Sequence, residues 1–245
     1  MLDVLRAVKV PRNQTAAMQL LQLYAQSGHV LWTAGRVVRG KLERLLAKLA
    51  PFRIDRNVPG RAYDRSRGLA SCHLVITDSE DEVLDWVLVS TQGRQGLGDP
   101  GAPDIGTIYD TTAQGQHLRW GLYELLHTEK RIGKVRDTTW TWRITRPHYK
   151  AHEALIVERA KRHDVAGLTQ EIAALAMMPM FSGVRGQVLK LYAEARKVAG
   201  KFGVRELTLP VLAYMTRQTV YDTPPATLVS LLPRVGVIVG GVATA

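Results

Sequence analysis

Five carboxylates between residues 78 and 85 are the first side chains in this sequence whose types and spacing could do chemistry: Asp78, Glu80, Asp81, Glu82 and Asp85. Carboxylates can hold two Mg²⁺ ions for phosphodiester cleavage, but that geometry usually draws its acids from separate strands. These five share one short polar stretch, which is typical of a solvated turn. We therefore expect no magnesium site here.

Two other arrangements contain residue types that could bind a metal or act as a nucleophile, but the neighbouring residues do not support either function. His148 and His152 are four residues apart, a spacing that can hold a metal ion, but no third ligand follows at a recognisable spacing. Cys72 is the single cysteine, and it lies in an apolar run without the basic neighbours that activate a thiol. We expect ordinary imidazoles, a buried thiol, no disulfide and no metal.

Gly96, Gly98 and Gly101 match the G-x-G-x-x-G spacing of dinucleotide-binding loops. That function requires a helix to begin in the loop, so that its amide groups meet a pyrophosphate. Pro100 and Pro103 stand where the helix would form. The segment is therefore expected to be a flexible acidic loop, and no cofactor is predicted.

Basic residues give the clearest indication of a partner. The 245-residue chain has a formal charge of +11 and an isoelectric point near 10.0, and such a field concentrates polyanions around a protein. Residues 1–70 carry 13 basic and 4 acidic residues, 71–117 carry 1 and 8, 118–163 carry 11 and 5, and 164–245 carry 8 and 5. Two basic blocks around an acidic one indicate one face for an anion, although clustered solvated charge would give the same pattern.

A helix is predicted over residues 14–25, and a longer amphipathic helix is predicted over 30–49. The second rests on apolar residues three and four positions apart: Val30, Ala34, Val37, Val38, Leu42, Leu45, Leu46 and Leu49. Its other surface would carry a basic stripe: Arg36, Arg39, Lys41, Arg44 and Lys48. Such a stripe can follow a phosphate backbone or remain solvated; without Trp or Phe anchors on the apolar stripe, we expect no membrane contact.

Residues 52–68 contain five arginines, two glycines and a proline without helical or strand period, which predicts a basic loop. Arginine forks match phosphates, and the ring of Tyr63 can stack on an unpaired base. The loop therefore indicates nucleic-acid binding, with a plain linker as the alternative. Its arginines are Arg53, Arg56, Arg61, Arg65 and Arg67.

Strand patterns dominate the middle of the chain. Residues 72–77 and 86–91 predict a hairpin, with a helix beginning at Glu80 as the competing interpretation. Residues 118–145 predict a longer hairpin, in which Trp140, Trp142 and Ile144 share one face that is expected to be core. The candidate phosphate-binding residues of this hairpin are Lys130, Arg131, Lys134 and Arg136 at its tip, and Arg143.

Helical periodicity returns after residue 145. Helices are predicted over 146–163, 165–178 and 183–202, followed by a short helical stretch from Pro210 to Val220. The order of helices, strands and helices predicts an α+β fold with one antiparallel sheet of about four to five strands, N-terminal helices and a C-terminal helical subdomain. We expect three units: 1–145, 146–232, and a C-terminal strand over 233–245 that returns to the sheet.

The glycines Gly236, Gly240 and Gly241 lie in this apolar C-terminal tail of a basic α+β chain. This tail resembles the glycine-rich loop near the end of CRISPR RNA-processing endoribonucleases with ferredoxin-like domains. The resemblance covers about ten residues and departs from the family pattern, because only Arg234 supplies charge. It implies metal-independent cleavage of an RNA hairpin by His, Tyr, Ser or Arg side chains; His127, His148 and Tyr149 are the candidates.

Three hypotheses follow from these patterns. The chain binds nucleic acid, with RNA favoured because no helix-turn-helix is evident; or it cleaves and retains an RNA hairpin, as in CRISPR RNA maturation; or it docks an acidic protein partner without catalysis. A ribonucleoprotein assembly is a further expectation. The N-terminus lacks the order of a secretory signal, and the longest apolar stretch, 235–245, is about half a bilayer span, so a cytoplasmic location is expected.

Overall fold

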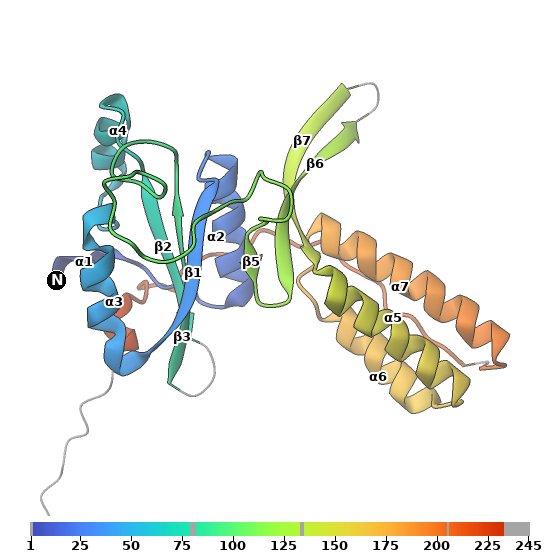
Figure 1. The fold of residues 1–245 in the computed structure, drawn as a ribbon. Helices are drawn as coiled ribbons and strands as arrows, with labels where there is room; N and C mark the ends of the chain where they lie inside the picture. The colour runs from blue at the N-terminus through green and yellow to red at the C-terminus, as the bar shows by residue number, and fades with distance from the viewer. Residues whose placement is uncertain (1, 79–81, 133–134, 205, 233–245) are drawn as a thin grey trace, which may run out of the picture.

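The computed structural model describes residues 2–78, 82–132, 135–204 and 206–232, and it confirms the α+β class. The strands form two antiparallel sheets, of four and three strands, rather than one. Figure 1 shows the four-stranded sheet among the N-terminal helices and the three-stranded sheet leading into three C-terminal helices.

The four-stranded sheet contains β1 (Leu31–Val38), β2 (Cys72–Asp78), β3 (Val83–Ser90) and β4 (Tyr109–Asp110) in the order β2-β3-β1-β4. β2 and β3 form the predicted hairpin, in which Leu74 pairs with Leu88. Side chains alternate between the two faces, as strand geometry requires. On β3, Leu84 and Leu88 enter one hydrophobic core, whereas Val87 and Val89 enter another.

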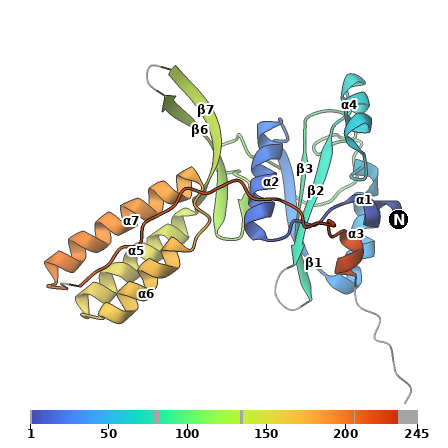
Figure 2. The ribbon, with the colours of Figure 1, turned by 180° about the vertical axis from the view of Figure 1, so that it is seen from behind.

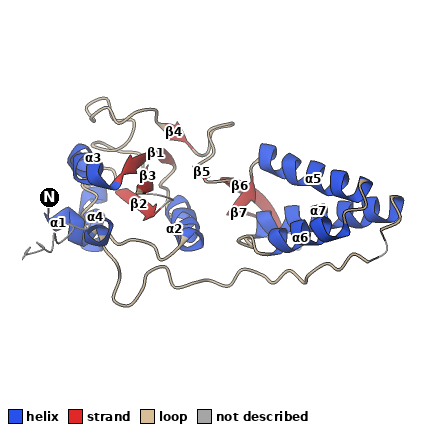
Figure 3. Ribbon diagram, turned by 90° about the horizontal axis from the view of Figure 1, so that it is seen from below, coloured by secondary structure: helices blue, strands red, loops and turns tan. Residues whose placement is uncertain are grey.

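Helices cover both faces of this sheet. α2 (Gln14–Gln26) confirms the predicted helix at 14–25 and packs with Val87 and Val89, while α1 (Leu2–Ala7) and α3 (Leu42–Leu49) pack on the opposite face. Viewed from below in Figure 3, α1, α3 and α4 (Val58–Ser66) lie on one side and α2 on the other. The short 3-10 helices Arg39–Lys41 and Ala50–Phe52 flank α3.

The three-stranded sheet contains β5 (Arg119–Trp120), β6 (Tyr123–Ile132) and β7 (Val135–Ile144). The predicted hairpin is confirmed, and Trp140, Trp142 and Ile144 are buried in the core that also contains α2. α5 (Arg146–Lys161), α6 (Val165–Ala176) and α7 (Ser182–Lys201) confirm the predicted helices to within two residues at each end.

Gly183 allows α7 to begin directly against β7. A Cβ atom at this position would lie 2.4 Å from the backbone oxygen of Trp142. That distance is too short for two atoms that are not bonded, so only glycine, which has no Cβ, fits here. The side chain of Gln187, one turn further on, accepts a hydrogen bond from Ile144 N and donates one to Ile144 O. These contacts join the helical part of the chain to the second sheet.

Residues 206–227, which we call the return segment, carry the chain from α7 back to α1. The predicted helix from Pro210 to Val220 is wrong, because this segment has no regular structure. Its backbone instead hydrogen-bonds to other segments: Arg12 N donates to Val220 O, and Val10 N donates to Ala226 O. In Figure 2 it crosses α2 before it enters the 3-10 helix Leu228–Leu231.

The single helix predicted over 30–49 is also wrong, because residues 31–38 form β1. This segment contains Trp32, Thr33, Val37 and Val38, which favour strands, and it pairs with β3 along its whole length. Helix α3 begins only at Leu42, with Leu42, Leu46 and Leu49 buried. The basic stripe is thereby divided: Arg36 lies on β1, and the cations after Val38 belong to the turn and α3.

The loop predicted over 52–68 contains helix α4. Its first turn is capped by Asn57, whose side-chain oxygen accepts a hydrogen bond from Gly60 N at 2.9 Å, and Pro59 stands in the first turn, where proline is tolerated. Sequence analysis missed this helix because it has no buried apolar stripe, and Asp64 is its only buried residue.

The C-terminal tail lies outside the described residues, so the predicted strand over 233–245 and the resemblance built on its glycines stay predictions. The proposed division at residue 145 also stays a prediction. One hydrophobic core contains Met18 of α2, Trp142 of β7 and Val188 of α7. No helix in the described part of the chain is long and apolar enough to cross a membrane.

Candidate nucleic-acid interface

Ion pairing divides the predicted phosphate-binding residues whose side chains are described into two groups. Five of them have carboxylate partners: Arg36 with Asp85, Arg39 with Asp78, Arg53 and Arg56 with Asp64, and Arg143 with Glu124. A guanidinium that already binds a carboxylate contributes less to the binding of a phosphate from another molecule. These five have roles in the fold, and their contact with nucleic acid stays a prediction.

Asp64 holds the segment before α4 in place. Its buried carboxylate accepts from Arg53 at 2.7 Å and contacts Arg56 at 3.2 Å. Arg53 adopts a left-handed backbone conformation, with a φ of 54°, which is uncommon for a residue with a side chain. The ion pairs therefore stabilise an unfavourable turn that directs the chain from α3 into α4.

Asp64→Asn should lower the free energy of unfolding by about 2–3 kcal/mol, because it removes charge-assisted hydrogen bonds at a buried site. Urea denaturation of the purified protein measures this change. Asp55→Asn is the matched control, since Asp55 is exposed in the same segment and should shift stability by less than about 0.5 kcal/mol. Equal effects of the two variants would contradict the structural role of Asp64.

Six predicted cations form no ion pair with any described residue. Three are exposed beside or on α3, and three belong to or follow α4: Lys41, Arg44, Lys48, Arg61, Arg65 and Arg67. On α3 they project away from the buried leucines. Figure 3 shows both helices on the same side of the four-stranded sheet, so the two groups of cations belong to helices on one face.

Arg61 differs from the other five because it is half-buried. Its Nη2 donates to Ile54 O at 3.1 Å, while its Nε is buried without a hydrogen-bond partner among the described residues. Burial lowers the pKa of this guanidinium. Arg61 therefore presents an incompletely bonded positive charge at the edge of the sheet.

A group of aromatic side chains, the Tyr24 cluster, interacts electrostatically with that charge: Tyr24, His29, His73 and Tyr221. The ring of Tyr24 stacks on His73 with centroids 3.9 Å apart, and His29 meets His73 edge-on at 4.8 Å. The two nitrogens of His29 lie 3.1 Å from Tyr24 O and 3.2 Å from Ser71 Oγ. The cluster joins α2, β2 and the return segment.

Both histidines of the cluster are neutral at pH 7. Burial, together with the positive charge of Arg61, lowers the pKa of His29 to about 4 and that of His73 to about 2. Burial also raises the pKa of the Tyr24 hydroxyl. A neutral cluster contributes packing beside Arg61, but at pH 7 it supplies neither an imidazolium acid nor a phenolate base.

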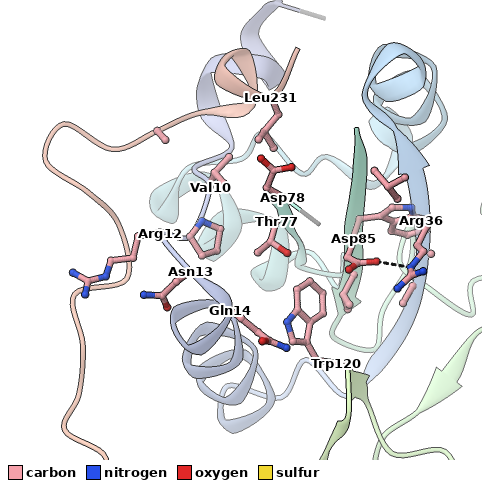
Figure 4. A pocket seen from close by; sticks show the side chains of 18 of the residues that line it. Val10, Arg12, Asn13, Gln14, Arg36, Thr77, Asp78, Asp85, Trp120 and Leu231 are labelled. Atoms are coloured by element: carbon pink, nitrogen blue, oxygen red, sulfur yellow. Dashed lines mark hydrogen bonds and ion pairs between the residues drawn. The ribbon is translucent and has the colours of Figure 1, made fainter. Parts of the chain in front are cut away.

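A cavity of about 1180 Å³ lies between the four-stranded sheet, the start of α2 and the end of the return segment. Figure 4 shows Asp85 paired with Arg36 on one wall, Thr77 and Asp78 nearby, and Trp120 beside Gln14 at the opposite end. Side chains of both charges line the cavity, including Arg12 and Asp222. This mixture selects anions less strongly than the α3 and α4 cations do.

The basic residues at the tip of the β6–β7 hairpin stay predicted phosphate contacts. Lys130 pairs in register with Asp137 and Arg131 with Arg136 near the ends of β6 and β7, which puts their backbones in the ribbon that Figure 1 shows extending from the sheet. Lys134 lies outside the described residues. Of this hairpin's candidates, only Arg143 has a described side chain, and its Nε donates to Glu124 at 2.7 Å.

The three catalytic candidates occupy two separate places. His127 is exposed on β6 and stacks on Trp140 at 4.7 Å, whereas His148 and Tyr149 lie in the first turn of α5. α5 follows Ile144, whose partner Tyr123 is four residues from His127, or about 13 Å along a strand. His148 Nδ1 lies 2.7 Å from Thr145 Oγ1. No described contact joins His127 to the other two.

The sequence also singled out Gly96, Cys72 and His152, and each of them packs against or bonds to other residues of the fold. Gly96 allows close packing, since a Cβ there would lie 2.3 Å from Ala70 Cβ, and the loop around it contains no helix. The Cys72 thiol is buried, as expected. His152 bonds to Glu171 at 2.5 Å. The described residues contain no group of three or more His, Cys, Asp or Glu side chains arranged to hold a metal ion.

Sequence reasoning missed the Tyr24 cluster entirely. Its members lie at positions 24, 29, 73 and 221, and no local spacing connects them. The one available signal was His73, a polar residue within an apolar strand pattern. Comparison of the chain with protein-family models, with curated proteins and with solved structures found no match.

Proposed function

We propose that this protein binds the phosphate backbone of nucleic acid, preferably RNA, through the cations of α3 and α4. The observation that supports this most directly is that six cations on or beside α3 and α4 lack ion-pair partners among the described residues, while five other candidates have them. Tyr63 adds an aromatic surface on α4, because its ring is 58% exposed and lies 5.4 Å from the Arg67 guanidinium. Exposed aromatic and arginine planes suit unpaired bases.

Replacing Lys41, Arg44 and Lys48 together by glutamine is expected to weaken RNA binding and to flatten its dependence on salt. Each lost phosphate contact on a single strand lowers the slope of log K against log salt by about 0.7, so three contacts lower it by about 2. Fluorescence anisotropy of a labelled RNA hairpin and of a single strand, at several salt concentrations, measures both quantities.

A matched control removes the same charge elsewhere. Lys190, Arg196 and Lys201 are exposed on α7 and form no ion pair with a described residue. Their replacement by glutamine should leave most of the affinity and the slope intact. Equal losses in the two triple variants would show that net charge, rather than the α3 surface, drives binding.

The endoribonuclease hypothesis uses the same RNA surface. Incubation of the labelled hairpin in EDTA tests it directly, since metal-independent cleavage would yield a shorter product that stays bound. A substrate that remains intact would leave binding as the function. His127→Ala and a double substitution of His148 and Tyr149 test the predicted catalytic residues if cleavage occurs.

The acidic-partner hypothesis makes a different prediction about the hairpin. A surface that docks acidic protein should bind RNA only weakly, and a co-purification from cells should yield protein without nucleic acid. Recovery of RNA with the protein supports backbone binding, and its size would show whether a ribonucleoprotein assembly forms. A cytoplasmic location belongs to the same proposal.

A further inference from the structure

One wall of the cavity of about 1180 Å³ is the face of the four-stranded sheet that α2 packs against. Thr77 and Asp85 are cross-strand partners on this face, because they alternate with Ile76 and Leu84, which enter the core on the other side. Figure 4 shows Thr77 above Gln14, which belongs to the first turn of α2. The cavity therefore lies where this helix begins.

The start of α2 offers backbone donors that no described residue uses. The side chain of Asn13 accepts a hydrogen bond from Ala16 N at 2.8 Å, and its backbone oxygen accepts one from Ala17 N at 3.0 Å. The backbone amides of Gln14 and Thr15 have no hydrogen-bond partner in the described part of the chain, and the first turn contains no acidic side chain. Free amides at this end of a helix favour an anion.

Two buried side chains add donors to the same cavity. Thr77 is 8% exposed and Trp120 is 6% exposed, and both line the cavity. Neither the Thr77 hydroxyl nor the Trp120 indole N–H forms a hydrogen bond with a described residue, and in contrast to Gln22 Oε1 both remain accessible from the cavity. Figure 4 shows both side chains directed toward the same space.

Gly121 brings Trp120 close to the start of α2. A Cβ atom at Gly121 would lie 3.0 Å from Gln14 Nε2, so the chain on either side of Trp120 lies against the first turn of the helix. An indole N–H and helix amides can only donate hydrogen bonds, and a hydroxyl can donate as well. These groups together fit an oxygen group that only accepts, such as a carboxylate or a phosphate.

The charges at the cavity favour a single negative charge over two. Asp85 pairs with Arg36, and Asp78 pairs with Arg39. Three further charged residues line the cavity without an ion pair to a described residue: Arg12, Arg119 and Asp222. They leave an excess of one positive charge, which matches a carboxylate better than a phosphate dianion. Both arginines are exposed, so they attract the anion from the rim.

We propose that this cavity binds the carboxylate of a small organic acid, with its oxygens held by the start of α2, Thr77 and Trp120. The side chains of Asp85 and Asp222 line the same cavity and accept hydrogen bonds. They favour a donor elsewhere on the ligand, as in a hydroxy acid or an amino acid. The site does not depend on RNA binding, because Figure 3 shows α3 and α4 on the opposite side of the sheet from α2.

The Trp120 indole N–H reports directly on this site. In heteronuclear NMR of the isotope-labelled full chain, lactate should move the Trp120 indole resonance, which Trp120→Phe assigns by removing it. Lactamide, which has the same shape without the charge, should bind at least about tenfold more weakly. The Trp32 indole already donates to Gln116 O at 2.9 Å and should not move. An unmoved Trp120 resonance, or equal affinities for lactate and lactamide, would overturn the inference and assign these donors to water.

Three further ligands test the rest of the occupant. Propionate lacks the second donor and should bind at least about threefold more weakly than lactate or alanine. The tighter of lactate and alanine identifies a hydroxy acid or an amino acid. Equal binding of all three would overturn the role of Asp85 and Asp222. Inorganic phosphate that binds more tightly than lactate would overturn the choice of a carboxylate.

Thr77→Val gives the sharpest variant. Valine has the same shape, and the Thr77 hydroxyl bonds to no described residue, so stability should be unchanged or higher while lactate affinity falls about fivefold. Thr216→Val, at an exposed position of the return segment outside the cavity, is the matched control and should bind as the wild type does. Equal lactate affinities of the two variants would overturn the assigned site.

The same measurements separate this inference from RNA binding. The Lys41, Arg44 and Lys48 triple variant should retain lactate binding while its RNA affinity falls. Loss of lactate binding in that variant would show that lactate follows net charge, and would overturn the inference. RNA binding without an effect of lactate overturns the cavity inference alone. Lactate binding without RNA binding supports the cavity and overturns the proposal for α3 and α4.

Discussion

Lowering the pH from 7 to about 4 should destabilise the protein through His29 and His73, by up to about 3 kcal/mol for each histidine. Both have folded-state pKa values at or below about 4, whereas an unfolded histidine titrates near 6.5. Between these values the unfolded chain takes up protons that the folded protein excludes. Stability is therefore complete above about pH 6.5 and falls as the pH decreases.

Urea denaturation at several pH values, for the wild type and for His73→Phe, measures this effect. The variant keeps a ring stacked on Tyr24 and should lose about half of the pH-dependent term between 6.5 and 4. His127→Phe is the control, because His127 is exposed and its replacement keeps a ring on Trp140. A His73→Phe profile parallel to that of the wild type would refute the neutral cluster.

Trp142→Ala is expected to lower the free energy of unfolding by about 3–5 kcal/mol, close to the whole stability of a marginal domain. Trp142 is fully buried, its indole donates to Met18 O at 2.9 Å, and it packs near Phe181. The substitution removes at once the contacts of β7 with Met18 of α2 and with Phe181, the residue before α7. Chemical denaturation followed by circular dichroism measures the loss.

Two comparisons make this test specific. Trp142→Phe should cost less, since it retains most of the ring, and Val211→Ala at a 96% exposed position should cost under about 0.5 kcal/mol. Because one core contains both sheets and the C-terminal helices, we expect a single unfolding transition. Two separate transitions would favour an independent helical unit at 146–232.

Local patterns predicted the elements whose surroundings are simple. Apolar periodicity located α2 and α7, Thr145 followed by Pro147 indicated the start of α5, an apolar run ending before Pro179 indicated α6, and strand patterns predicted the two hairpins. The segment 30–49 failed because apolar residues at 30, 34, 37 and 38 fit helical spacing by coincidence. Pairing with β3, which is more than 40 residues further along the chain, decided the structure.

Composition predicted a basic protein but not which cations lack an ion-pair partner and can bind an external anion. Arg53 and Arg56 are close in sequence to Arg61 and Arg65, yet the first two bind Asp64 and the second two form no ion pair with a described residue. That distinction depends on where α4 places its one buried acid. The Tyr24 cluster depends likewise on the path of the return segment, which the sequence predicted to be helical from Pro210 to Val220.

The return segment also determines the order in which this protein can finish folding. Gln19 and Gln218 bond to each other across 199 positions, so a ribosome adding about 5–20 residues per second completes α2 some 10–40 s before its partner emerges. During that interval the return segment does not yet cover Leu20 and its apolar neighbours on α2. We therefore expect newly synthesised, unfinished chains to be the form most prone to aggregation and most dependent on chaperones.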